Sequence, residues 1–420
     1  MTDISGIKNV TVVGAGFMGY GIAHVALLAG FDKVILNDIK KEALDNAVKQ
    51  IEIGILKCEE LGRLPAGTTA ESLMKRLIKD VDLKRAVDNA DFIIEAVPEK
   101  LDLKLDIYGK LGEYAPKHTI IASNTSFMDI SRLGEASGRP EKVVGMHFIP
   151  PIISSKLIEV TKGKKTSNET WEICSAIGEK LPCASGDRFI ARIEKWSPGF
   201  ILNRLLGSVG LYFGWIAEKA LEKGIPWEQL DADLALDDES MGLCETWDYI
   251  GLDVAYDSMN YLKEYLSPDF ESTSGVFQEK VESGELGAKT GKGFYEWPKG
   301  GRYFFEWTKE FRPKTDRSKK AGLLDLETII AIEINEGCRL LQEGVISGYK
   351  TIDDVMHIGS REQWPGPFIT GKRIYENLCV KLEELAKNSG KGYFKPCDLM
   401  KSGEFLKMRK PKLKPTLPLA

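Results

Sequence analysis

The segment Val10–Gly19, with the sequence VTVVGAGFMG, constrains the fold of this chain more than any other feature. An apolar run ends there in three glycines and continues into a helix-like pattern. A strand that ends in G-x-G-x-x-G and opens a helix lets the backbone approach a pyrophosphate, at which the helix directs its free N–H groups. The segment therefore predicts a dinucleotide-binding βαβ unit. The predicted cofactor contacts in its turn are Gly14, Gly16, Phe17, Met18 and Gly19.

An acidic residue follows this turn at the expected distance. A second buried strand is predicted at Lys33–Asp38, and Asp38 stands 19 residues after Gly19. A carboxylate at that place accepts hydrogen bonds from the ribose hydroxyls and repels a 2′-phosphate. We therefore expect NAD rather than NADP as the cofactor. The alternative, a glycine turn in a βαβ unit that binds nothing, does not account for the acid.

Composition excludes several other classes of protein. The chain has 420 residues, enough for two or three domains, and a net charge of −5, which argues against nucleic acid as a partner. The seven cysteines are scattered without a C-x-x-C pair, so we expect reduced thiols and no metal site. The longest apolar run, Leu205–Ala217, is too short to span a membrane, and the N-terminus does not resemble a signal peptide. We therefore expect a cytoplasmic protein.

Apolar strands and amphipathic helices alternate from Asn9 to about Ala184, which predicts an α/β Rossmann-type doubly wound sheet domain. Lys40 to about Leu61 indicates a helix that belongs to a pair protruding from the sheet. After Ser197-Pro198-Gly199 the pattern becomes helical. The predicted domains are a NAD-binding domain (1–196), a helical domain (197–297), a linker (298–320) and a second helical domain (321–420).

The second helical domain repeats the first. The segment from Ala217 (AEKALEKGIPWEQLDADLAL) and the one from Asn335 (NEGCRLLQEGVISGYKTIDDVM) share a helix, a short loop and an acid-led second helix, with a period of about 120 residues. We expect the second copy to cover the first as an internal pseudo-dimer, in a chain that is a monomer or a homodimer. The segment GAKTGKG (Gly287–Gly293) fails the spacing of a phosphate loop and predicts a turn.

Polar residues follow the predicted strands at the sheet edge where ligands of α/β proteins bind. They are Glu99, Asn124 and Ser126, and His147 leaves a further strand in the run GMHFIPP. Beside a nicotinamide ring, a histidine can remove the proton of an alcohol. Glu159, twelve residues later on a neighbouring predicted strand, is placed to accept the other ring N–H. The alternative is a core histidine bound by a backbone carbonyl.

Asn203 lies in the apolar helix start PGFILNRLL and is a candidate ligand for a substrate oxygen, or a helix-capping or surface amide. His24, His118 and His357 lie away from the predicted strand ends, and we interpret them as structural.

Seven motifs in order resemble the L-3-hydroxyacyl-CoA dehydrogenases. They are VTVVGAGFMG, Asp38, EAVPE with Lys104, SNTS, GMHF with KLIEV, PGFILNRLL and GAKTGKGFY. The second helical copy is similar to that of the long members with tandem helical domains, and we find no hydratase domain in the sequence. The resemblance implies that His147 is the base and Glu159 its partner, that Ser126 and Asn203 lie near the reacting oxygen, and that Glu99 and Lys104 lie near the nicotinamide ribose.

The chain departs from the family pattern on the substrate side. Where the family has H-F-F-N-P, this chain has His147-Phe148-Ile149-Pro150-Pro151, so that Pro150 replaces an asparagine. The segment SMGLCE (240–245) also lacks the prolines of the family's P-M-G-P. We therefore expect NAD-dependent oxidation of a (S)-3-hydroxyacyl-CoA to the 3-oxoacyl-CoA, or the reverse, on an atypical substrate. The alternatives are a dehydrogenase of free hydroxy acids, of the gulonate or carnitine type, and a catalytically weak NAD-binding structural paralogue.

Overall fold

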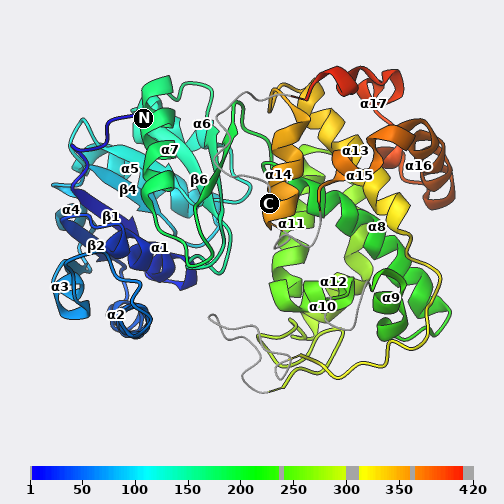
Figure 1. Cartoon of the computed structure of the whole chain (residues 1–420), viewed down its shortest axis with the longest axis horizontal. Helices are drawn as coiled ribbons and strands as arrows, with labels where there is room; N and C mark the ends of the chain where they lie inside the picture. Colours follow the sequence, from blue (N-terminus) through cyan, green and yellow to red (C-terminus); the bar gives the residue numbers. More distant parts are fainter. Residues whose placement is uncertain (1, 236–240, 299–311, 360–364, 410–420) are drawn as a thin grey trace. The chain divides into compact units, whose positions relative to one another are not determined.

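The computed structural model describes residues 2–235, 241–298, 312–359 and 365–409. They form two compact units (Figure 1): residues 1–200 with 357–363, and residues 201–356 with 364–420. The first unit continues to Phe200, past the predicted domain end at residue 196. The predicted linker (298–320) and the segment SMGLCE (240–245) fall partly outside the described residues.

The first unit is built on one eight-stranded sheet with the order β3-β2-β1-β4-β5-β6-β7-β8. All neighbouring strands are parallel except β6 and β7, which are antiparallel. The strands are β1 (Asn9–Val13), β2 (Lys33–Asn37), β3 (Leu77–Asp80), β4 (Phe92–Glu95), β5 (Ile120–Ser123), β6 (Val143–Phe148), β7 (Leu157–Lys162) and β8 (Phe189–Ile193).

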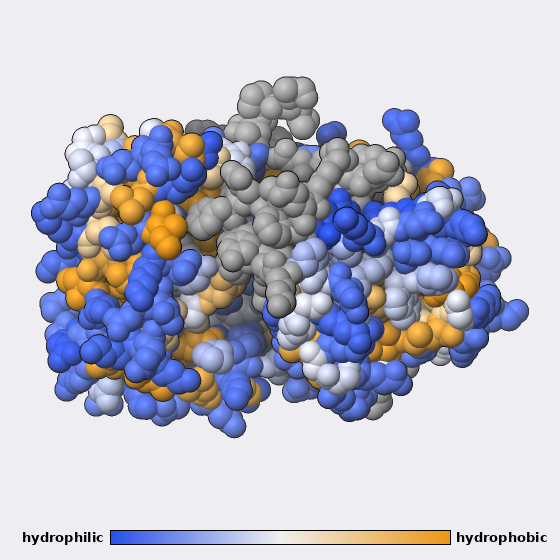
Figure 2. Space-filling view, turned by 90° about the horizontal axis from the view of Figure 1, so that it is seen from below, coloured by the Kyte–Doolittle hydropathy of each residue, from blue (hydrophilic) through white to orange (hydrophobic). Residues whose placement is uncertain are grey.

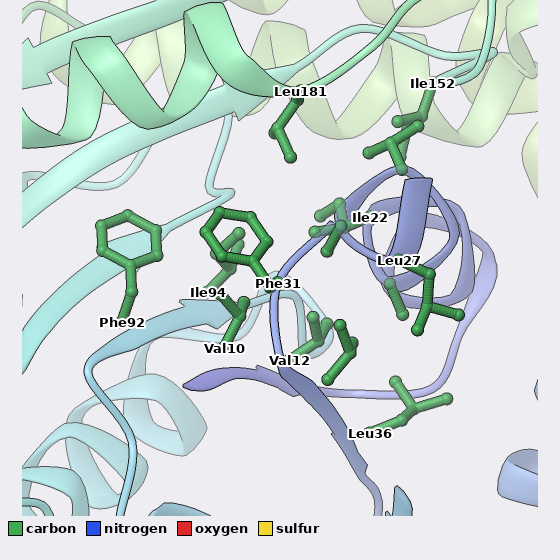
Figure 3. Close-up of a cluster of buried hydrophobic side chains, with 14 of the residues drawn as sticks. Val10, Val12, Ile22, Leu27, Phe31, Leu36, Phe92, Ile94, Ile152 and Leu181 are labelled. Carbon is green, nitrogen blue, oxygen red and sulfur yellow. The ribbon is translucent and has the colours of Figure 1, made fainter. Parts of the chain in front are cut away.

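Successive side chains of a strand point to opposite faces of a sheet, and the central strands are apolar on both faces. Val10 and Val12 of β1 join the core that α1 (Phe17–Leu28) and α2 (Lys41–Glu60) cover, whereas Val13 joins the core of α5 (Leu101–Tyr114) and α6 (Ile130–Ser137) on the other face. Figure 3 shows the first of these cores, with Ile22 and Leu27 of α1 beside β1. The predicted doubly wound α/β sheet is confirmed. Its helices are α1 (Phe17–Leu28), α2 (Lys41–Glu60), α3 (Ala70–Met74), α4 (Leu83–Val87), α5 (Leu101–Tyr114), α6 (Ile130–Ser137) and α7 (Asn168–Lys180).

Helix α2 differs in one respect from the predicted protruding pair. Its apolar face, including Ile51 and Ile55, is buried in the core with α1. The helix comes so close to α1 that a Cβ on Gly54 would lie 2.5 Å from Cε1 of His24. His24 is buried here, and burial lowers its pKa to about 4. This histidine is therefore a neutral packing residue, in line with its structural interpretation.

In the part of the second unit that the structure describes, the regular elements are helices, apart from isolated bridges near its middle. Its main helices are α8 (Leu202–Glu222), α9 (Trp227–Leu234), α10 (Leu243–Ile250), α11 (Leu252–Tyr265), α12 (Ser274–Glu282), α13 (Leu326–Gln342), α14 (Tyr349–Gly359), α15 (Pro367–Gly371), α16 (Tyr375–Ser389) and α17 (Asp398–Ser402). Helix α8 packs along α13, which brings the two predicted helical copies together within this unit.

A buried ion-pair cluster joins α8 to α13. Arg204 is 1% exposed and donates from Nε to Glu336 Oε1 at 2.5 Å and from Nη1 to Glu343 Oε2 at 2.6 Å. Glu336 also accepts from Arg339 and from the Tyr393 hydroxyl, at 2.7 and 2.8 Å. Burial opposes ionisation of Glu336, but Arg204 and Arg339 hold its pKa below the ordinary value. The first helical copy thus supplies a buried cation whose counter-charges come from the second.

The two copies share a detail beyond their helix order. Asp231 of α9 accepts from the Cys244 N–H at 2.8 Å, and Asp353 of α14 accepts from the Phe368 N–H at the same distance. In each copy a glycine two residues before that N–H lies too close to the aspartate to carry a Cβ. The equivalent contacts support the duplication that the sequence indicates.

The turn Gly287–Gly293 has a structural role, as its spacing predicts. Asp248 at the end of α10 accepts from the N–H groups of Phe294 and Tyr295 and from the Trp297 indole, at 2.8 to 2.9 Å. A Cβ on Gly293 would lie 2.1 Å from the Asp248 carboxylate. The glycine-rich segment is therefore folded around a buried aspartate.

Hydrophilic residues dominate the face of the molecule in Figure 2, and apolar residues form smaller groups between them. No helix within the described residues is both long and apolar enough to cross a membrane. The same residues hold no cluster of histidine, cysteine and acidic side chains arranged as a metal site.

Candidate active site

The antiparallel pairing of β6 and β7 creates the centre of the site. The register places His147 directly opposite Glu159. Opposite residues on one sheet face are near enough for their side chains to interact. His147 Nδ1 lies 2.8 Å from Glu159 Oε2, and both side chains are buried, at 5% and 0% exposure. The strand pairing therefore brings together the two residues that the sequence proposes as a dyad.

The other ring nitrogen of His147 faces a serine of the loop after β5. His147 Nε2 lies 3.1 Å from Ser126 Oγ. With Nδ1 bound to a carboxylate, the neutral ring carries its proton there and presents Nε2 as an acceptor. The arrangement leaves Nε2 able to accept a proton from a hydroxyl group, which is the chemistry of a general base.

Glu99 fixes the loop that carries Ser126. Its Oε1 accepts from the Ser126 N–H at 3.0 Å and from the Thr125 hydroxyl. Its Oε2 lies 3.1 Å from Lys104 Nζ. Glu99 lies in the loop after β4, and its hydrogen bonds therefore hold the neighbouring loop after β5 in place.

Next to Glu99 lies a buried group centred on Glu95, an acid that the sequence does not single out. Glu95, the last residue of β4, accepts from Lys104 Nζ at 2.6 Å and from Ser123 Oγ at 2.7 Å. Lys104 is 1% exposed, so its ammonium is enclosed between the two carboxylates. Burial by itself lowers the pKa of Lys104, but Glu95 and Glu99 raise it above the ordinary value. In the sequence, the first acid of EAVPE, Glu95, together with the later Lys104, is the pattern that indicates this group.

The glycine turn fits a bound pyrophosphate. Gly16 precedes the first turn of α1, which has no side-chain cap and no acidic residue. A Cβ on Gly16 would meet nothing within 4 Å, whereas one on Gly14 or Gly19 would clash with backbone, at 2.5 and 1.8 Å. Two glycines thus permit the tight turn, and the third leaves open space at a helix N-terminus, where an anion is favoured.

Asp38 is tied to the same turn. Its Oδ2 accepts from the Ala15 N–H and its Oδ1 from the Lys40 N–H, both at 2.9 Å. The carboxylate is thus held just after the end of β2, beside the glycines.

The connection between His147 and Glu159 is anchored from both sides. Asn124 Oδ1 accepts from the Phe148 N–H at 2.9 Å, and Ile152 packs into the core over α1 (Figure 3). Arg188, which the sequence reasoning missed, donates to the carbonyl oxygens of Ile152 and Pro182 at 2.8 Å. Burial lowers the pKa of Arg188, whose hydrogen bonds to carbonyl groups secure the loop. Pro150 is exposed on this loop.

The remaining candidates lie elsewhere. Asn203 is half-buried at the start of α8 in the second unit, and its role stays a prediction. His118 is an exposed residue that lies 3.1 Å from Asp91 Oδ1, and His357 lies in α14. Neither shares the surroundings of His147.

Two family models match this chain. "3-hydroxyacyl-CoA dehydrogenase, NAD binding domain" matches residues 9–183, and "3-hydroxyacyl-CoA dehydrogenase, C-terminal domain" matches residues 199–297. The probable 3-hydroxybutyryl-CoA dehydrogenase of Deinococcus radiodurans is 35% identical over 290 residues, which are 68% of this chain and 99% of that protein.

Two further relatives match nearly the whole chain. The fatty acid oxidation complex subunit alpha of Shewanella baltica is 29% identical over 408 residues, 94% of this chain and 55% of that protein. The crystal structure of 3-hydroxybutyryl-CoA dehydrogenase from Escherichia coli K12 is similar with a TM-score of 0.77 at 26% identity, over 96% of this chain and 99% of that chain. The likeness therefore includes the second helical copy.

Proposed function

Since the chain belongs to the 3-hydroxyacyl-CoA dehydrogenase family, we propose that it oxidises a (S)-3-hydroxyacyl-CoA to the 3-oxoacyl-CoA with NAD, or catalyses the reverse reduction. The observation that carries this proposal is the chain of contacts from Glu159 through His147 to Ser126, at 2.8 and 3.1 Å. Relatives named as 3-hydroxybutyryl-CoA dehydrogenases support a short acyl chain as the first substrate to test.

His147 acts as the general base in the proposed mechanism. Its Nε2 takes the proton of the substrate hydroxyl, while Glu159 holds the Nδ1 proton and stabilises the positive charge that forms on the ring. Ser126 Oγ, next to Nε2, donates a hydrogen bond to the reacting oxygen, and Asn203 is proposed as its second ligand. Bound NAD supplies the acceptor for the hydride that leaves C3. In the reverse reduction, the protonated His147 returns the proton to the oxygen.

The turn with Gly14, Gly16 and Gly19 is proposed to bind the pyrophosphate, together with the backbone of Phe17 and Met18. Asp38 is proposed to accept from the ribose hydroxyls and so to favour NAD over NADP, because its charge opposes a 2′-phosphate. Glu99 is proposed as a ligand of the nicotinamide ribose, with Lys104 as the buried cation that holds it. Asn124 is proposed as a further cofactor contact through its amide.

We also propose that the second helical copy covers the first in place of a partner subunit. The Arg204 cluster supports this, because both of its acids come from α13 or the residue after it. The domain boundaries at 196, 297 and 320 and a cytoplasmic location remain part of this proposal.

The test of the function is a turnover screen with NAD and NADP. The substrates are 3-hydroxybutyryl-CoA, a long-chain, an aromatic and a cyclic 3-hydroxyacyl-CoA, and free gulonate and carnitine. We expect activity on at least one thioester with NAD. Activity on the free hydroxy acids alone would show that the proposed substrate class is wrong. The replacement of the family's asparagine by Pro150, in the loop after His147, would then be the first explanation for the different substrate. Absence of turnover on every compound with NAD bound would favour the structural paralogue.

A further inference from the structure

The chain leaves the first unit through a tight turn at Ser197–Phe200. The Phe200 N–H donates to Ser197 O at 2.9 Å. Pro198 stands at the second position and Gly199, with φ of 73°, at the third, an arrangement typical of a type II turn. The hydrogen bond and the glycine explain the turn itself without any further distortion.

Phe200, the next residue, is in the left-handed region with φ of 51°. It is the one non-glycine residue with positive φ among the residues that the structure describes. A bulky side chain is disfavoured there, and it has no polar group to form the local hydrogen bond that makes asparagine tolerable. Strained backbone of this kind persists where the surroundings determine the position of the side chain.

The side chain of Phe200 lies against the proposed base. It is fully buried, and its ring centroid is 5.4 Å from that of His147 with an angle of 60° between the ring planes. Glu159 and Ser126 fix the two nitrogens of the imidazole along its edge. Neither of these contacts limits how the ring tilts or keeps water away from it.

We infer that Phe200 is a positioning residue for His147: its left-handed backbone delivers an aromatic ring that fixes the tilt of the imidazole between Glu159 and Ser126. The inference rests on the proposed function, because it gives His147 the role of base.

A pair of variants separates the ring from the backbone. Phe200→Ala and Phe200→Gly remove the same ring, but only glycine accepts the positive φ without strain. We expect both variants to lower the kcat for reduction of 3-oxobutyryl-CoA by about 10- to 100-fold, because the base is misplaced. This kcat is expressed per NADH-binding site, so that unfolded protein is not counted. The KM for NADH should stay within about twofold, since the glycine turn is untouched. The glycine variant should melt at a higher temperature than the alanine variant.

The control is Phe92→Ala, which removes a fully buried phenylalanine from the first position of β4 in the same unit, where β5 separates β4 from the strand of His147. We expect it to lower the melting temperature with kcat per site unchanged. If Phe200→Gly folds and turns over like the wild type, the inference is wrong, whatever the stability. If His147→Ala keeps its turnover, the proposed function fails together with the inference. Loss of turnover in His147→Ala with full turnover in Phe200→Gly overturns the inference alone.

Discussion

Replacing Glu159 by glutamine tests the dyad with the smallest change of shape. Glu159 is 0% exposed and its Oε2 lies 2.8 Å from His147 Nδ1, so the carboxylate meets the imidazolium without intervening water. Removing one partner of a buried ion pair costs about 3 to 5 kcal/mol. The charged ring forms only during the reaction, and each 1.36 kcal/mol changes the rate tenfold, so we expect kcat to fall by about 10² to 10⁴. The amide also offers an N–H donor that favours the wrong tautomer.

The assay is steady-state reduction of 3-oxobutyryl-CoA by NADH, with NADH affinity measured by fluorescence. The control is Glu172→Gln, the same substitution on α7, where the carboxylate is 40% exposed and binds Arg192. We expect NADH affinity to be unchanged in both variants and turnover to fall only in Glu159→Gln. A loss of turnover smaller than about tenfold in a folded Glu159→Gln protein would refute the ion-pair argument, since a charge-assisted hydrogen bond alone accounts for that much.

Three other predictions follow from the structure. The double variant Asp38→Ser/Ile39→Arg should narrow the preference for NADH over NADPH. It removes the carboxylate of Asp38 and places a positive charge at the neighbouring position 39, where the wild-type Ile39 is 86% exposed. A wild-type protein that prefers NADPH would contradict this prediction. Burial raises the pKa of Asp353 to about 7, so the folded state keeps a proton that the unfolded chain loses near pH 4. The free energy of unfolding should therefore fall by about 3 kcal/mol as the pH rises from 5 to 8. Denaturant unfolding of Asp353→Asn should lack this slope. A fragment of residues 1–320 should aggregate, because Arg204 loses Glu336 and Glu343; a soluble, monomeric and fully active fragment would show that α13 does not cover α8.

The sequence predicts the first unit well where the signal is local. The glycine turn and the central strands follow from short apolar runs and their spacing. The opposition of His147 to Glu159 is only a hypothesis from the sequence, and the antiparallel register of β6 and β7 supplies it. Strand β3 and strand β8 are weaker signals, since all four side chains of β3 are exposed or half-buried and β8 lies beyond the predicted end of the sheet pattern. Alternation of apolar residues reports burial, so an edge strand without burial leaves little trace.

The residues that support the dyad were beyond sequence reasoning because their partners are distant in the chain. Glu95 binds Ser123, 28 residues away, and Arg188 binds the carbonyl of Ile152, 36 residues away. A buried acid or arginine gives no signal of its own in one sequence, and its partner is visible only once the strands are placed. Phe200 is similar, since nothing in the run PGFILN reveals that its phenylalanine has a positive φ.

The Arg204 cluster also determines which copies of the helical domain can pair with each other. Helices α8 and α13 end alike, with Lys223 and Glu343 each followed by a glycine of positive φ, so these two residues occupy equivalent places in the two copies. If two first copies from separate chains met as α8 meets α13, Arg204 would face Lys223 instead of Glu343, which would give a buried guanidinium a like-charge neighbour. The Arg204 contact is thus complementary between the two copies, but it would not be complementary between two identical first copies. Because both copies belong to one chain, each face can carry a charge that an identical partner would repel, and the Arg204 cluster opposes pairing between two identical first copies.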